Sequence, residues 1–177
     1  LDNSGNVYLC GYANAGGGGG DKNFFVARCN TACDTFLWEY IYNSGGGVTL
    51  DEAKDIVVSP DGYIYVTGQS NDAYMVTVKL DSSGNTQWIN VDNNGTEGNA
   101  IAIDRDGYIL VAGDTRTGPN FNYLLAKYRG DSSSVWIRTC DKSTDDKAFG
   151  VATDQCGYIY VSGNSFSATY DYLVIKY

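Results

Sequence analysis

The stretch Gly62-Tyr-Ile-Tyr-Val-Thr-Gly68 decides the fold, because it recurs three more times along the chain. Each copy begins and ends with glycine and holds β-branched, aliphatic or aromatic residues between, which is typical of a β-strand bounded by turns. The other copies are Gly5-Asn-Val-Tyr-Leu-Cys-Gly11, Gly107-Tyr-Ile-Leu-Val-Ala-Gly113 and Gly157-Tyr-Ile-Tyr-Val-Ser-Gly163. Four copies of one strand predict an internal repeat.

Three further strands accompany these copies in a constant order. The second strand of each group carries a basic residue, and these residues, spaced by 51, 48 and 49 positions, are Arg28, Lys79, Lys127 and Lys176. A third strand carries Trp38, Trp88 or Trp136, and an apolar fourth strand precedes the next copy, at 55–58, 100–103 and 149–152. A unit of four short strands about every 50 residues has the period of a propeller blade.

This pattern resembles a known family, the bacterial-type β-propeller repeat (SBBP repeat), and is more distantly similar to NHL-type blades. The resemblance rests on an Ala-Ile-Ala-Val-Asp-like strand, an Asp-x-x-Gly turn, a Tyr-Val-Thr-Gly strand, a Leu-Val-Lys-Tyr-like strand and a tryptophan. It covers nearly the whole chain, and it implies a β-propeller of four-stranded blades. Such repeats occur in secreted and surface proteins whose roles are mostly unassigned.

The repeats predict one all-β propeller domain over 1–177, with four blades at about 1–43, 53–92, 99–141 and 148–177. If the similarity to NHL-type blades fixes the strand order, the first blade lacks its innermost strand and the last blade lacks its tryptophan strand. Three explanations stay open. The chain is a segment of a longer polypeptide, or partner chains cover the open edges, or four blades close a ring with two incomplete members.

Composition supports the all-β prediction and excludes several functions. The chain has 22 Gly, and its 18 Asp outnumber its 3 Glu, as expected where Asp serves in turns. A net charge of −9 argues against nucleic acid as a partner. No apolar run reaches the roughly 18 residues of a membrane-spanning helix. Histidine is absent, which excludes Ser-His-Asp and Cys-His catalysis.

Loops at one end of the predicted blades are the candidate ligand site, because they vary while the strands repeat. Among their residues we single out Tyr12, Asp72, Asp114, Arg116 and Tyr170. The Asp-x-x-Gly turns lie at the other end and resemble the start of a calcium loop, but the downstream Glu of that motif is absent. We therefore expect backbone-capping turns and predict no metal and no cofactor.

Five cysteines cannot all pair within one chain. Cys29 and Cys33 flank the turn before the first tryptophan strand, which makes them candidates for a disulfide and favours an oxidising compartment. Asn94, in the sequence Asn94-Gly-Thr96, is the candidate glycosylation site on a loop.

Taken together, these features predict a non-enzymatic, extracellular or surface-associated structural or interaction module. Its partners would be other protein chains or copies of itself, recruited through open edge strands. The alternative is a carbohydrate-binding propeller, because tyrosine rings can stack on sugars. A carboxylate-dependent hydrolase or lyase comes third.

Overall fold

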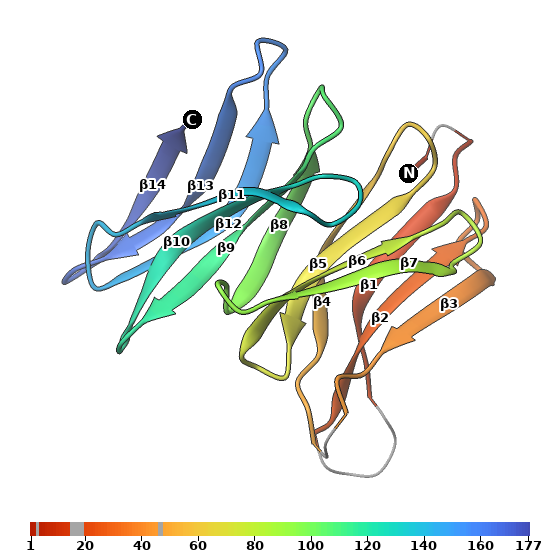
Figure 1. Cartoon of the computed structure of the whole chain (residues 1–177). Coiled ribbons are helices and arrows are strands. Elements are labelled where there is room, and N and C mark those ends of the chain that lie inside the picture. Colours follow the sequence, from red (N-terminus) through yellow and green to blue (C-terminus); the bar gives the residue numbers. More distant parts are fainter. Residues whose placement is uncertain (3, 15–19, 46–47) are drawn as a thin grey trace.

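The computed structural model describes residues 1–2, 4–14, 20–45 and 48–177. The strands fall into four antiparallel units that follow one another along the chain. Figure 1 shows the units side by side, from β1–β3 on the right to β14 on the left. The all-β prediction is confirmed, since every element of the described chain is a strand. Nothing in those residues is a helix long and apolar enough to cross a membrane.

The first two units form separate sheets. The first contains β1, β2 and β3, paired in that order, and the second contains β4, β5, β6 and β7. Their bounds are Val7–Asn14, Lys22–Cys29 and Phe36–Tyr42 in the first unit, and Glu52–Val58, Ile64–Ser70, Tyr74–Leu80 and Thr86–Asp92 in the second.

The last two units share one seven-stranded sheet. Strands β8 to β11 pair antiparallel, as do β12 to β14, and a single parallel pair, Phe121 with Asp145, joins β10 to β12. The bounds are Glu97–Ile103, Ile109–Thr117, Asn120–Tyr128 and Ser134–Cys140 in the third unit, and Asp145–Thr153, Ile159–Phe166 and Tyr170–Lys176 in the fourth.

Three apolar cores lie between neighbouring units rather than inside any one sheet. Between the first and second units, Phe24 and Val26 of β2 pack against Ile64 and Val66 of β5. Equivalent clusters join the second unit to the third and the third to the fourth. Because strand residues alternate between faces, each internal unit uses both faces for such cores. The use of both faces explains why the inner strands carry apolar residues at successive positions.

The turns before β9 and β13 follow the predicted backbone-capping geometry. The Asp104 carboxylate accepts the backbone N–H groups of Asp106 and Tyr108 at 2.9 and 3.0 Å, and Gly107 has a φ of 82°. Asp154 does the same for Cys156 and Tyr158. A short carboxyl side chain can replace missing backbone acceptors in this way, and the glycine permits the left-handed backbone.

No pairing between described strands joins the fourth unit to the first. The structure is consistent with a propeller-like fold, but no closed ring of sheets is present among these residues. The division into four blades, with the first and last incomplete, therefore stays a prediction.

Candidate functional site

A repeated hydrogen-bonding arrangement joins consecutive units. Arg28 Nη1 and Trp38 Nε1 both donate to the carbonyl of Ser82 in the second unit, each at 3.1 Å. Lys79 Nζ and Trp88 Nε1 donate to the carbonyl of Gly130 in the third, at 3.0 and 2.9 Å. We call this arrangement the turn clamp, since in both places the acceptor lies in the turn between the last two strands of the following unit.

In the part of the chain that the structure describes, no other unit covers the outward face of the first unit. Leu9 on β1 lies at the position of Val66, Val111 and Val161 in the strand repeat. Those three valines are 0–1% exposed, because a preceding unit packs on them, whereas Leu9 is 38% exposed. Phe36 and Phe25 lie on the same face, with ring centroids 6.0 Å apart. This apolar surface is the first open face.

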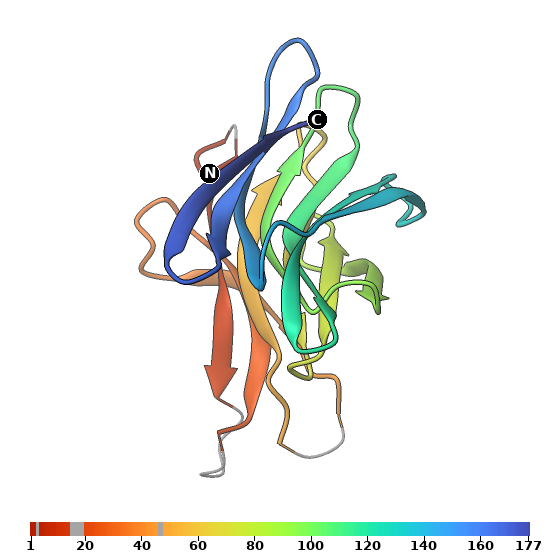
Figure 2. The ribbon, with the colours of Figure 1, turned by 90° about the vertical axis from the view of Figure 1, so that its left-hand side faces the viewer.

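The outward face of the fourth unit is also uncovered, and it lies toward the viewer in Figure 2. Tyr172 is 91% exposed, whereas its repeat equivalents, Phe24, Met75 and Tyr123, are at most 1% exposed. Val174 is 59% exposed, and its equivalents, Val26, Thr77 and Leu125, are likewise buried. Lys176 belongs to the same face and completes what we call the second open face.

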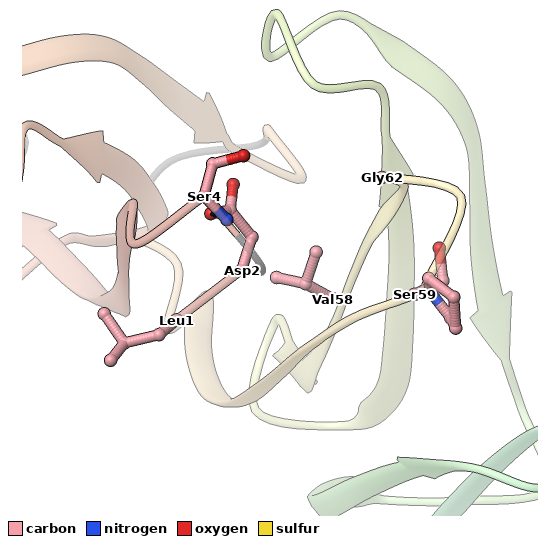
Figure 3. A pocket seen from close by; sticks show the side chains of 7 residues that line it. Leu1, Asp2, Ser4, Val58, Ser59 and Gly62 are labelled. Carbon is pink, nitrogen blue, oxygen red and sulfur yellow. Dashed lines mark hydrogen bonds between the residues drawn. The ribbon is translucent and has the colours of Figure 1, made fainter.

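Two crevices open between units, beside the turns that follow β4 and β8. The smaller, about 240 Å³, lies between Leu1, Asp2 and Ser4 on one side and the turn from Val58 to Gly62 on the other (Figure 3). The larger, about 370 Å³, has a volume typical of small-molecule sites. Its lining includes Asp61, Tyr65 and Lys79. Both lie at the end of the strands opposite the predicted ligand loops.

The five predicted ligand residues belong to four different units. Tyr12 is half exposed, with Lys22 Nζ 4.0 Å from its ring centre, and Asp72 is exposed at a turn with a φ of 52°. Arg116 is exposed beside Phe121, and Tyr170 is 70% exposed, with its ring centroid 4.7 Å from that of Phe166. These side chains stay candidates for a ligand. Asn94 is exposed, as its predicted role requires.

Asp114 differs from the other four because it is buried, at 1% exposure. Its Oδ1 accepts a hydrogen bond of 3.3 Å from Asn99 Nδ2. Burial raises the pKa of this carboxyl to about 6, against the opposing effect of Lys147, and Glu97 adds to the rise. It lies beside a row of alternating charges on the first strands of successive units, in which Lys54 Nζ is 3.6 Å from Glu52 and 4.0 Å from Glu97.

Sequence reasoning missed Asp51. This carboxylate is fully buried and accepts hydrogen bonds from Ser44, from the Thr49 hydroxyl and from the Asn71 backbone N–H, at 2.8–3.1 Å. Asp51 thus connects two loops. A single Asp in a chain with 18 of them gives no sequence signal for this role. Among the described residues, no group of three or more potential ligands could hold a metal ion.

Cys29 and Cys33 are both free thiols, and their sulfur atoms lie 2.8 Å apart. Their shared hydrogen bond raises the pKa of Cys29 to about 11. Because little movement separates the sulfurs from bonding distance, we expect mild oxidation to join this pair before any other. Peptide mapping of the oxidised protein should show a 29–33 link, and Cys33→Ser should abolish it. The link should stabilise the fold by about 2 kcal/mol, as expected for a short loop. A dominant link to Cys10, Cys140 or Cys156 would contradict this prediction.

The stacked all-β units and their inter-unit cores are consistent with a propeller-like fold. Residues 86–118, which span β7, β8 and β9, match the family model of the SBBP beta-propeller repeat. The resemblance drawn from the strand copies is thereby confirmed.

Among solved structures, a protein of unknown function from Bacteroides caccae, with a crystal structure at 1.35 Å, has a TM-score of 0.56 to this chain. The two are 13% identical, and the match covers 94% of this chain but 57% of that one. At this identity the likeness shows the fold alone. No curated protein is significantly similar to the chain.

Proposed function

We propose that this chain is a non-enzymatic, extracellular interaction module that binds other protein chains through its two open faces. The observation that carries the proposal is the contrast between equivalent positions. Tyr172, Val174 and Leu9 are exposed, whereas the residues at the same repeat positions in other units are buried. The same sequence pattern that builds an inter-unit core inside the chain is thus presented to solvent at both ends of the array.

Burial of these side chains would favour association. Transfer of a valine- or leucine-sized side chain out of water contributes about 1.5–3 kcal/mol when burial is complete. Contiguous apolar surface rimmed by polar groups is a common mark of protein interaction sites. Among the described strands, β1 and β14 pair on one side only, so each also offers unpaired backbone groups to a partner strand.

The proposal is tested with charged substitutions on the two open faces. Leu9→Asp and Val174→Asp should each reduce self-association by about tenfold or more, because a carboxylate loses its hydration on contact with an apolar partner. Sedimentation velocity over a range of protein concentrations measures the effect. Ile89→Asp is the matched control, since Ile89 is 42% exposed but lies on β7, within the array.

A monomeric wild-type chain at all concentrations would overturn self-association through these faces. Equal weakening by Ile89→Asp would attribute the effect to added charge rather than to the open faces. Circular dichroism of all three variants must show the same strand content as the wild type, and we expect it to, because each replaced side chain is already exposed.

A further inference from the structure

We propose that Lys176 anchors a head-to-tail contact in which the second open face receives the first unit of another copy of this chain. Its ammonium would donate to the backbone carbonyl of Thr31, in the turn between β2 and β3 of that copy. This inference rests on the proposed function and adds to it a partner, a polarity and an anchoring residue.

The turn clamps within the chain indicate where the acceptor lies. In both clamps, the accepting carbonyl belongs to the residue three positions after the basic residue of the next unit. Ser82 follows Lys79 by three positions, and Gly130 follows Lys127 by three. The same step from Arg28, the basic residue of the first unit, leads to Thr31. Thr31 is exposed, so its turn is accessible to another chain.

Lys176 is held in the geometry of a clamp residue. Lys79, which makes a clamp, has its Nζ 3.9 Å from the ring centre of Tyr63 and 5.3 Å from that of Tyr65. For Lys176 the corresponding distances, to Tyr158 and Tyr160, are 3.5 and 5.3 Å. Tyrosine faces attract cations, so the two rings position the ammonium before any partner arrives.

The ammonium of Lys176 is also available. Lys127, at the repeat position of Lys79, makes no turn clamp with the described residues; its Nζ lies 2.7 Å from Asp104 Oδ2 of its own unit. The equivalent carboxylate in the fourth unit, Asp154, accepts the hydroxyl of Tyr160 at 3.0 Å, and its attraction to Lys176 acts without a direct contact. Lys176 is exposed, and nothing in the described part of the chain forms a salt bridge or hydrogen bond with its ammonium.

Charge complementarity favours the first unit as the occupant. The turn that carries Thr31 also carries Asp34, whose carboxylate is exposed and accepts a 2.7 Å hydrogen bond from Asn30 Nδ2. The apolar surface beside it, with Leu9 and Phe36, matches the uncovered Tyr172 and Val174. The second open face thus offers a cation and apolar side chains to a surface with an anion and apolar side chains.

The first experiment removes the ammonium. Lys176→Met should weaken self-association by about tenfold, the usual effect of losing a charge-assisted hydrogen bond. Lys142→Met is the matched control, because it makes the same change at an exposed lysine in the loop between β11 and β12. Sedimentation equilibrium measures both constants. Association that is unchanged in Lys176→Met would overturn the anchoring role while leaving the proposed function intact.

The second experiment tests polarity by mixing variants. In a head-to-tail contact, Leu9→Asp disrupts the first open face, whereas Lys176→Met or Val174→Asp disrupts the second. Each variant alone should therefore associate weakly. An equimolar mixture of Leu9→Asp with Val174→Asp should form a 1:1 dimer, because one intact face of each kind remains. Failure of the mixture to associate, when the wild type does, would overturn the head-to-tail arrangement. Absence of self-association in the wild type would overturn this inference and the self-association in the proposed function together.

Discussion

Replacing Gly113 by alanine should destabilise the fold by about 3 kcal/mol or more, at the upper end of the cost of overpacking. A Cβ at this position would lie 2.0 Å from the backbone carbonyl oxygen of Glu97, on the neighbouring strand β8. The first strand of the unit bulges here, between Gly98 and Ala100, and its backbone crosses directly over the glycine. Because the obstacle is backbone, it cannot move aside without breaking the pairing of β8 with β9. A Cβ added to Gly68 or Gly163 would likewise clash with the backbone carbonyl oxygen of Glu52 or Lys147.

Gly11 is the matched control for this prediction. It ends the same strand motif in the first unit, but no described atom lies within 4 Å of a Cβ built on it, because none of the described strands pairs with β1 on that side. Gly11→Ala should therefore change stability by less than about 0.5 kcal/mol. Urea unfolding followed by circular dichroism measures both variants. Similar midpoints for Gly113→Ala and Gly11→Ala would contradict the crossing seen in the third unit.

The order of the strands and the chemistry of the turns could be predicted from sequence, because both are local. Alternating β-branched and aromatic residues specify a strand, and an Asp followed by a glycine specifies the capping of a turn, as Asp104 and Asp154 show. The sequence shows that each strand copy ends in glycine. The reason, a bulged neighbouring strand whose backbone crosses over the glycine, can be seen only once the pairing register of the two strands is known.

The candidate site could be predicted less well, because it depends on which unit covers which face. Tyr172 and Tyr123 occupy equivalent repeat positions, yet one is exposed and the other buried. No local pattern separates them. The turn clamps were missed for a related reason. Trp38 and Trp88 were recognised as repeat markers, but their acceptors lie 44 and 42 residues further along the chain, in the next unit. Only the stacking of units brings these groups together.

Asp114 and Asp146 are both buried, but their contributions to the stability of the fold should change with pH in opposite directions. Burial would raise the pKa of Asp146, but hydrogen bonds from Ser165, from the Lys142 N–H and from Ser143 outweigh it and hold that pKa below its usual value of 3.8. Asp114 has fewer such donors, and burial raises its pKa to about 6. The difference arises from the number of N–H and O–H groups directed at each carboxylate.

Asp114→Asn should therefore stabilise the protein at neutral pH. The folded chain binds the Asp114 proton more tightly than the unfolded chain does, so this carboxyl favours folding most below its unfolded pKa of 3.8. That contribution is lost as the pH rises toward 6. A shift of about two pKa units corresponds to about 3 kcal/mol, so the variant should match the wild type near pH 4 and exceed it by up to that amount at pH 8. The asparagine retains an oxygen to accept the Asn99 hydrogen bond.

Asp146→Asn should change the stability of the fold in the opposite direction to Asp114→Asn. Its lowered pKa means that ionised Asp146 stabilises the fold above its unfolded pKa and loses that effect as the pH falls through the folded pKa. The variant should be less stable than the wild type at pH 7, with a smaller difference at pH 3. Urea unfolding at pH 4, 6 and 8 for Asp114→Asn, and at pH 3 and 7 for Asp146→Asn, measures both profiles. If Asp114→Asn were less stable than the wild type at pH 8, the charged carboxylate would have to be stabilised by Lys147 and Lys54 more strongly than it is penalised by burial.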